Sequence, residues 1–248
     1  MARCWTSREI AGVSMPRVVG PEWLDHLPAD DPRAVRSRGD LRRINRVMSA
    51  TRWLGEALDP LVAGRVNVRL IELGSGDGSL LLRLAESRAH AWPPISLGLL
   101  DLQPVVAPAT LDRYRALGWT PDVIHGDVFD WLAGTHAHAG KEDSPIIVAN
   151  LFLHHFEGQR LAELVHGIAT RAHAFVCLEP RRSRTALFGS RLLGAVGCND
   201  VTRHDAVVSV RAGFTDRDLS ACWPRDQGWE LREHRAGLFS HRLIAVRR

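Results

Sequence analysis

Apolar and polar positions alternate in blocks along this chain, and the clearest block runs from residue 66 to residue 88. Residues 66–73 are mostly valine, leucine and isoleucine between Gly64 and Gly74, which predicts a buried strand. From Ser79 onward, leucine and alanine recur at helical spacing with charged residues on the opposite side, which predicts an amphipathic helix. The glycines of residues 74–78 therefore lie at a strand-to-helix turn.

The same alternation continues toward the C-terminus. Further strands are predicted at 96–101, 121–125, 145–150 and 173–178, with helices at 102–118 and 156–172. Alternating strands and helices favour an α/β fold, a parallel sheet with helices on both faces. The final segments, 229–236 and 239–246, are joined at Gly237 and predict an antiparallel hairpin.

Two stretches fall outside this alternation. Residues 1–60 contain a helical pattern over 40–58 that is expected to start at Asp40, either as a lid over the sheet or as a cover for an exposed core face. We expect a main domain at 61–248 with a substrate-side insertion at about 181–214. Within that insertion, residues 198–214 have an apolar, strand-like pattern, and a helix is expected to begin near Thr215.

The composition is that of a soluble globular protein. Of 248 residues, 45% are hydrophobic and 24% are charged. No apolar run reaches the roughly 18 residues of a membrane span, and the N-terminus makes a poor signal peptide, so we expect a cytoplasmic protein without membrane contact. The four cysteines form no C-x-x-C pair, which indicates neither a metal site nor a disulfide framework.

The formal net charge of +4 is only weak evidence for a polyanionic partner such as a nucleic acid. Lys141 is the only lysine among 32 basic residues, and genome base composition alone can produce such an arginine bias. Arginine outnumbers acid from Arg181 onward, but no run of adjacent bases exceeds two. We therefore expect a solvated surface rather than a nucleic-acid partner.

The glycine-rich turn has the sequence IELGSGDG at residues 71–78. Glycines permit positive φ and let a ligand lie against the main chain, while the next helix offers free N–H groups. A dinucleotide fingerprint needs its third small apolar residue at Ser79, but the glycine is at Gly78. A phosphate-binding P-loop needs a lysine that this turn lacks. Neither nucleotide motif fits.

The spacing Glu72-x-Gly74-x-Gly76-x-Gly78 resembles motif I of the class I S-adenosylmethionine-dependent methyltransferases. The resemblance covers roughly residues 66–246 and implies a seven-stranded, mostly parallel Rossmann-like sheet that ends in an antiparallel hairpin. It implies S-adenosyl-L-methionine as cofactor, with Glu72 toward its amino-acid end. The alternative role for Glu72 is a structural hydrogen bond within a buried strand.

Two aspartates stand where that family contacts ribose and adenine. Asp101 ends the second strand and would accept hydrogen bonds from both ribose hydroxyls. After the third strand, Asp127 would accept from the adenine amine and Val128 would offer its backbone N–H. Taken singly, such aspartates are more typical of helix caps and turns. The other cofactor-binding positions that the resemblance implies are Ser75, Leu102, Asn150 and Leu151.

The fourth strand leads into ANLFLHHFE, which lacks both the Asn/Asp-Pro-Pro-Tyr/Phe motif of amino-methyltransferases and the acidic ligands of the metal-dependent catechol type. Its LHH resembles the small-molecule methyltransferases, some of which use the first histidine as a base. His154 is therefore the first candidate base and His155 the second, unless the pair only caps or packs under the next helix. Glu179, after the fifth strand, would orient such a histidine or merely form a turn.

The insertion offers a second polar group. His204 paired with Asp205 is an alternative base, and Arg211 would meet an acidic or carbonyl group of the substrate. The alternative is an additional hairpin with ordinary surface charges.

The resemblance implies a methyltransferase that acts on a small molecule, with a hydroxyl of a phenolic or polyketide-like metabolite as the expected acceptor. The rival readings are a macromolecular methyltransferase acting on RNA or protein, and a non-catalytic partner subunit that binds the cofactor. The atom methylated and the oligomeric state are left open.

Overall fold

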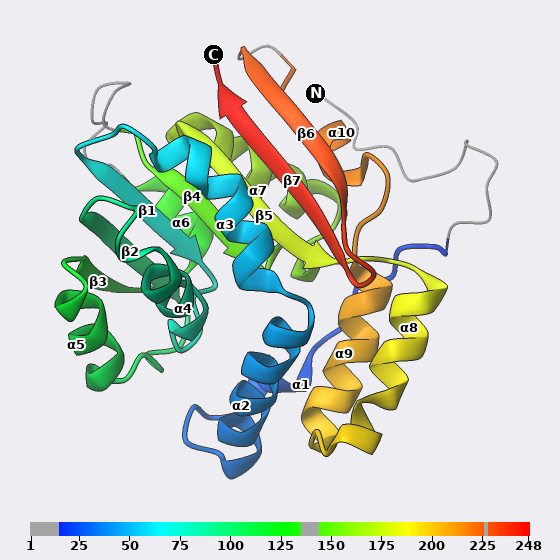
Figure 1. Cartoon of the computed structure of the whole chain (residues 1–248). Coiled ribbons are helices and arrows are strands. Elements are labelled where there is room, and N and C mark those ends of the chain that lie inside the picture. The colour runs from blue at the N-terminus through cyan, green and yellow to red at the C-terminus, as the bar shows by residue number, and fades with distance from the viewer. Residues whose placement is uncertain (1–14, 135–143, 226–227) are drawn as a thin grey trace.

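A computed structural model of the chain describes residues 15–134, 144–225 and 228–248. Cys4, Lys141 and the N-terminal residues on which the expected cytoplasmic location rests lie outside these ranges. Seven strands form one sheet in the order β3-β2-β1-β4-β5-β7-β6 (Figure 1). The strands are β1 (Val68–Leu73), β2 (Ile95–Asp101), β3 (Thr120–His125), β4 (Ile146–Asn150), β5 (Ala174–Pro180), β6 (Trp229–Ala236) and β7 (Ser240–Arg247).

The first five strands are parallel, and β7 pairs antiparallel with both β5 and β6. This confirms the predicted parallel sheet with a terminal hairpin. The register places Leu73 of β1 beside Leu100 of β2 and Ala149 of β4. The residues that follow these three therefore meet at one edge of the sheet.

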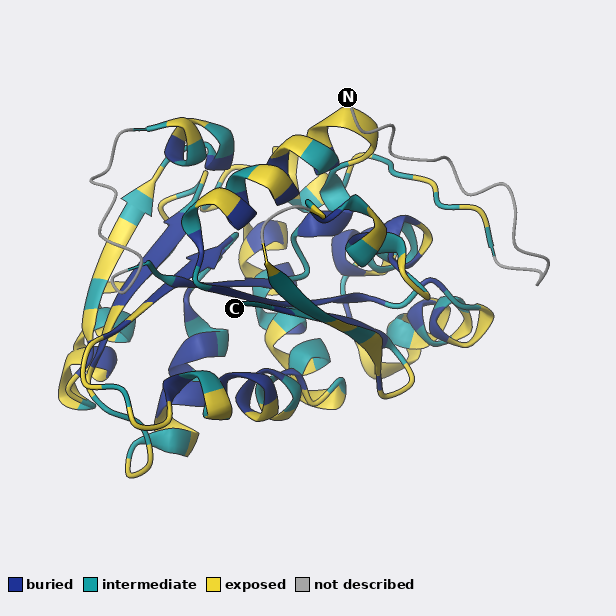
Figure 2. Cartoon of the chain, turned by 90° about the horizontal axis from the view of Figure 1, so that it is seen from above, coloured by how far each residue is buried: buried dark blue, intermediate teal, exposed yellow. Residues whose placement is uncertain are grey.

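Helices cover both faces of the sheet, and their outer sides are exposed, while the central strands are buried and the edge strands β3 and β6 are largely exposed or intermediate (Figure 2). One core cluster joins the sheet to α3 (Ala50–Val62) and α4 (Ser79–Arg88), with α5 (Pro108–Ala116) alongside. A second cluster on the opposite face involves α6 (Val128–Ala133), α7 (Gly158–Arg171) and α10 (Asp218–Cys222). Each cluster buries the apolar stripe that the helical periodicity predicts.

The remaining helices gather beyond the carboxyl ends of the parallel strands, below the sheet in Figure 1. They are α1 (Trp23–His26), α2 (Pro32–Val47), α8 (Arg184–Arg191) and α9 (Asp200–Ala212), with the short 3-10 turns η2 (Leu153–His155) and η3 (Leu192–Val196). Contacts join α9 to α1, α2, α8 and η2. The carboxyl edge, where ligands bind in such sheets, is thus flanked by N-terminal segments and by the insertion.

The prediction of one helix over 40–58 that starts at Asp40 is wrong. Helix α2 begins earlier, because Asp31 accepts a hydrogen bond from the backbone N–H of Arg33 and Pro32 occupies the first turn. A second helix, α3, starts after Ser49, whose φ of 55° interrupts the first. Asp40 is instead buried inside α2, where it accepts from the backbone N–H of Asn199.

The prediction of a strand-like segment over 198–214 is also wrong, because this stretch forms helix α9. Asn199 caps the helix by accepting from the backbone N–H of Thr202 at 2.8 Å. The buried Thr202 and Asp205 side chains then bond to α2 and α1. These tertiary contacts override the β-propensity of its valines. The next helix, α10, begins at Asp218 rather than near Thr215.

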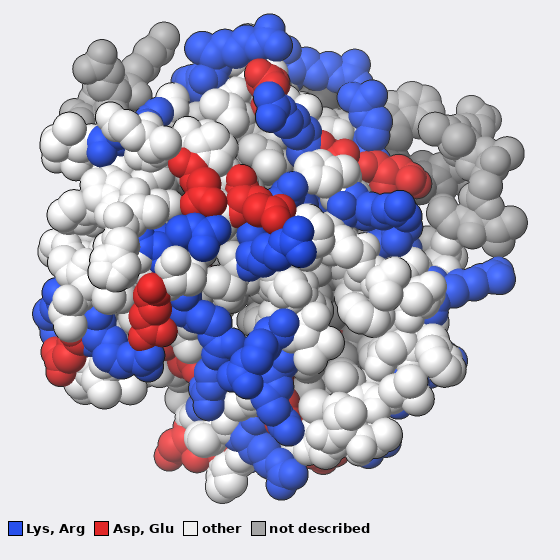
Figure 3. Space-filling view, viewed as in Figure 1, with Lys and Arg blue, Asp and Glu red and all other residues white. Residues whose placement is uncertain are grey.

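Charge is interspersed over the face in Figure 3, where arginines gather over α2 and acidic side chains lie among them. Arg42 pairs with Asp77 and Arg43 with Asp40. Among the described residues, no helix combines the length and the apolar character needed to cross a bilayer.

Candidate active site

The glycine-rich turn joins β1 to α4, and Gly74, Gly76 and Gly78 all have positive φ, of 66°, 52° and 69°. The turn is tied to β2, because the backbone N–H groups of Gly74 and Ser75 both donate to the Leu100 carbonyl. A Cβ on Gly74 would lie 2.4 Å from the Phe152 ring, whereas a Cβ on Gly76 would meet nothing within 4 Å. The turn is therefore closely packed at its first glycine and open at its second.

Asp101, at the end of β2, organises this turn. Its Oδ2 accepts from the Gly76 N–H and its Oδ1 from the Gln103 N–H, both at 2.8 Å. Each oxygen retains a second lone pair, so the carboxylate can still accept from a ligand. Leu102, directly after it, is 65% exposed.

Asp127 is the N-cap of α6, the structural role that an isolated aspartate suggests. Its Oδ1 accepts from the backbone N–H groups of Phe129 and Asp130. Its Oδ2 has no hydrogen-bond partner among the described residues and lies at the same edge as Asp101. Val128, the first residue of α6, is buried. The cap thus leaves Oδ2 available to accept a hydrogen bond from a ligand.

Three buried polar atoms around the turn have no hydrogen-bond partner within the described part of the chain: Glu72 Oε2, Ser75 Oγ and Asn150 Oδ1. They come from β1, the glycine-rich turn and the neighbouring β4. The Asn150 amide nitrogen is engaged, since it donates to Asn45 Oδ1 on α2 at 3.3 Å. Buried polar groups are rarely left unpaired. Three together fit a ligand that brings its own donors, such as the ammonium and hydroxyl groups of an amino acid and a sugar.

Burial raises the pKa of Glu72 well above its usual range, and the charges of Asp77 and Asp101 add to this effect. The folded protein thus keeps a proton that the unfolded chain releases. Stabilisation from this group is present at acidic pH and is lost as the pH rises through the folded-state pKa.

We expect Glu72→Gln to be more stable than the wild type at alkaline pH, because glutamine has no proton to lose there. A gain of about 1 kcal/mol would raise Tm by about 2–4 °C in a domain of this size. Thermal unfolding of both proteins between about pH 5 and pH 9 measures the difference, which should widen with pH. A constant difference across this range would contradict the assignment of a buried, titrating Glu72.

His154 lies in the η2 turn that follows β4, where Leu151 adopts a positive φ of 54°. Glu179 at the end of β5 shapes this turn: its carboxylate accepts from the backbone N–H groups of Phe152, Leu153 and His154. The same carboxylate lies 2.8 Å from His154 Nδ1. The two candidates that the sequence paired are therefore in direct contact.

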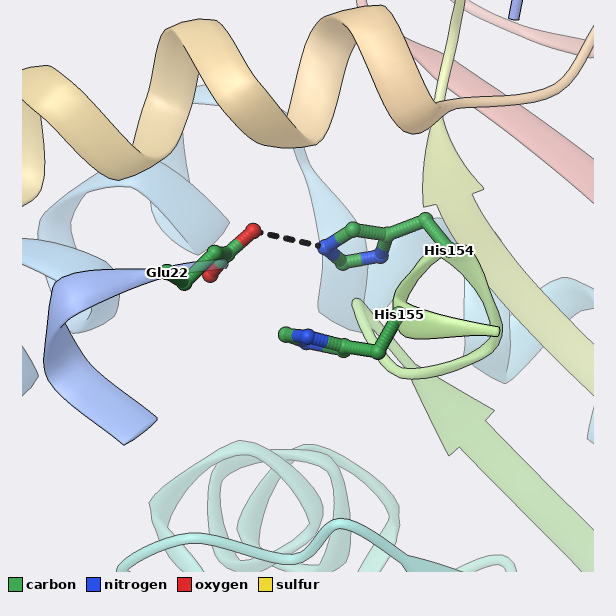
Figure 4. A group of neighbouring side chains, drawn as sticks. All are labelled: Glu22, His154 and His155. Atoms are coloured by element: carbon green, nitrogen blue, oxygen red, sulfur yellow. Dashed lines mark hydrogen bonds and ion pairs between the residues drawn. The ribbon is translucent and has the colours of Figure 1, made fainter. Parts of the chain in front are cut away.

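The opposite nitrogen of His154 faces a residue that the sequence did not indicate. Glu22, at the start of α1, places its Oε1 3.1 Å from His154 Nε2 (Figure 4). Burial lowers the pKa of His154, but hydrogen bonds to Glu179 and Glu22 outweigh it and raise the pKa to about 9. No local motif surrounds Glu22, and its partner is 132 residues away, so only the fold reveals the contact.

His155 is partly exposed and its Nδ1 lies 3.3 Å from Asp25 Oδ2. Figure 4 shows Glu22 and the two histidine rings pointing toward one another. One ligand atom from each lies within 4.8 Å of the others, which is compatible with a divalent cation. Both His154 nitrogens lie at hydrogen-bond distance from a carboxylate. Hydrogen bonds therefore explain the position of this ring without a metal ion.

The second polar group of the insertion anchors α1. Asp205 accepts from the backbone N–H groups of Trp23 and Leu24 and from His204 Nδ1. The His204 ring stacks on Trp23 with centroids 4.0 Å apart. Arg211 is exposed, and among the described residues no hydrogen bond or ion pair joins its side chain to His154 or His155. His204 and Asp205 thus have structural partners, and the predicted role of Arg211 stays a prediction.

The sequence matches no protein-family model and no curated protein. Its structure is similar to an O-methyltransferase family protein from Burkholderia thailandensis (TM-score 0.57, 18% identity, 88% of this chain and 61% of that one). It is also similar to the plantazolicin methyltransferase BpumL in complex with SAH (0.60, 12%, 88% and 92%) and to the pyocyanin biosynthetic protein PhzM (0.50, 15%, 91% and 61%).

The chain spans about three fifths of the length of the Burkholderia protein and of PhzM. At these identities the likeness establishes the fold, which is that of the class I S-adenosylmethionine-dependent methyltransferases, as the sequence predicts.

Proposed function

We propose that this protein is an S-adenosyl-L-methionine-dependent methyltransferase that methylates an oxygen of a small molecule, with a phenolic or polyketide-like metabolite as acceptor. The observation that carries the proposal is the set of three unpartnered buried polar atoms beside a bare glycine-rich turn. The fold supports it, because similar structures include proteins described as methyltransferases, one of them with SAH bound.

The residues present fit the cofactor. Asp101 would accept from the ribose hydroxyls while it holds the turn, and Asp127 with Val128 would bind adenine. The open face of Gly76 leaves room against the main chain. The amino-acid end would lie near Leu151 and satisfy Glu72, Ser75 and Asn150. When bound, the cofactor supplies an electrophilic methyl group on a sulfonium.

His154 would move the acceptor's proton. Glu179 fixes Nδ1, which leaves Nε2 as the nitrogen that exchanges a proton with the acceptor, once Glu22 has withdrawn as the neutral acid and carried the first Nε2 proton away. While both carboxylates are in contact, the pKa of His154 is about 9, so the ring is protonated at neutral pH. A general base is most effective when its pKa lies near the working pH, and loss of the Glu22 contact lowers the pKa of His154 toward that range. We propose that His155 lines this site but does not act as the base, because its Nδ1 is paired with Asp25.

The cofactor proposal is tested by calorimetric titration with S-adenosylhomocysteine. We expect Asp101→Ala to bind it at least about tenfold more weakly, because the loss of a charge-assisted hydrogen bond costs about 1.5–3 kcal/mol. Asp122→Ala is the matched control, since Asp122 is an exposed aspartate on the neighbouring strand β3. Equal affinity in all three proteins would refute the ribose assignment, and no binding to the wild type would refute the proposed function.

A further inference from the structure

The contact between Glu22 and His154 belongs to a segment fixed over the carboxyl edge of the sheet, the N-terminal strap, which we define as residues 15–26. Arg17 donates to the carbonyls of Ala212, His154 and Phe156. Asp205 caps the start of α1 through the Trp23 and Leu24 N–H groups. The strap is therefore tied to the η2 turn and to α9 by side chains on both sides of Glu22.

Glu22 receives two donors on one oxygen. Its Oε1 accepts from His154 Nε2 and from the Ser209 hydroxyl on α9, whose one proton is shared with the Asp205 carbonyl, and its side chain is only 11% exposed. The other oxygen has no hydrogen-bond partner among the described residues. Two converging donors, one of them on a protonated ring, form a site for an oxyanion.

The protonation of His154 follows from the geometry of its neighbours. A neutral imidazole donates from one nitrogen only, yet both nitrogens of His154 face carboxylates at 2.8 and 3.1 Å. A second proton is needed to satisfy both contacts. His154 is therefore an imidazolium that binds the Glu22 carboxylate at Nε2. The same state, an imidazolium beside an oxygen anion, is reached when a phenol gives its proton to a neutral His154.

We propose that the Glu22 carboxylate occupies the position of the acceptor's oxygen, and that an acceptor enters by displacing Glu22 from His154 Nε2 and Ser209 Oγ. Glu22 leaves as the neutral acid with the Nε2 proton, and the acceptor then gives its own proton to the neutral imidazole, which restores the imidazolium beside a bound oxyanion. This inference rests on the proposed function. It deepens that function by defining the acceptor as a molecule whose oxygen ionises in the site, a phenol or an enol. A neutral oxygen that cannot ionise has no proton to give to Nε2, so His154 would keep only the charge-assisted hydrogen bond to Glu179.

The charges around Glu22 are consistent with this role. His155 lies beside it and, like His154, lowers its pKa, whereas burial opposes both. Asp205 on α9 contributes a negative charge nearby, since Glu22 raises the pKa of that carboxyl. Glu179 balances His154 from the β5 side. Removal of Glu22 thus takes one negative charge from His154 Nε2, and an incoming oxyanion replaces it.

The test is a titration with 4-nitrophenol in the presence of S-adenosylhomocysteine, at a pH where the free phenol is protonated. The bound phenolate is detected by its visible absorption. We expect Glu22→Ala to bind the probe on the order of tenfold more tightly than the wild type, as when a site open about a tenth of the time becomes fully open. Asp30→Ala, an exposed carboxylate on the next turn, should bind like the wild type.

Two further arms distinguish an oxyanion site from a vacated pocket. The gain should be absent with 4-nitroanisole, which cannot ionise, and the phenolate signal should be lost in Glu22→Ala combined with His154→Ala. An equal gain for both probes, or an unchanged affinity in Glu22→Ala, would overturn the proposal. So would phenolate binding that requires added Zn²⁺ and is abolished by a chelator, because a cation would then hold the oxygen.

The outcomes separate this inference from the proposed function. If S-adenosylhomocysteine binds but Glu22→Ala leaves 4-nitrophenol affinity unchanged, only the role of Glu22 is wrong. If S-adenosylhomocysteine does not bind, the methyltransferase proposal is wrong.

Discussion

Replacing His154 with alanine is expected to lower kcat by about 10²- to 10⁴-fold, the usual contribution of a general base. The reason is that Nε2 is the atom placed to take the acceptor's proton, while Glu179 fixes the ring from the other side. The affinity for S-adenosylhomocysteine should not change, because His154 does not line the glycine-rich turn. Initial rates with an acceptor found by screening phenols, and calorimetry with S-adenosylhomocysteine, measure the two quantities.

Two controls accompany this variant. His166→Ala removes an exposed histidine from α7 and should retain full activity. His154→Gln keeps a polar group beside the buried Glu179, which tests whether alanine acts only by leaving that carboxylate unpaired. Full activity in both His154 variants would remove histidine catalysis from the mechanism, whereas normal cofactor binding with lost turnover would support it.

Gly76→Ala is expected to weaken S-adenosylhomocysteine binding by about 10- to 100-fold. A Cβ at this position projects into open space, where the proposal places the cofactor. Inserting a methyl group into occupied space costs about 1–3 kcal/mol, which corresponds to this range of affinities. Calorimetric titration provides the dissociation constants.

Gly118→Ala is a closely matched control. Gly118 also has a positive φ, of 78°, and a Cβ there would likewise meet nothing within 4 Å. It follows α5, away from the glycine-rich turn. Both variants bear the same backbone strain, about 1–3 kcal/mol, so only the loss of ligand space differs. Equal binding by the two variants would mean that the cofactor does not lie against Gly76.

The strands and the glycine-rich turn could be predicted because their signals are local. The run of residues 66–73 is rich in valine, leucine and isoleucine, as is typical of a central parallel strand, and the glycines mark where the backbone must turn. The contact of His154 with Glu179 was accessible as well, since both follow parallel strands that are neighbours in this fold. The strand order then brings them together.

The elements that were predicted wrongly depend on contacts distant in sequence. The α9 helix has strand-favouring valines, and its cap and its buried Asp205 become decisive only with α1 and α2 in place. The break at Ser49 between α2 and α3 interrupts what is otherwise continuous helical periodicity. Glu22 has no motif at all, and its role arises from a strap anchored by residues that lie far along the chain.

The single carboxylate of Glu179 both sets the bend after β4 and sets the charge of His154. The shape of the η2 turn and the proton affinity of His154 therefore depend on the same side chain. Replacing Glu179 with aspartate, which is shorter, is expected to loosen the η2 turn and to lower the pKa of His154 at the same time. A substitution at this position therefore cannot change one of these properties and preserve the other.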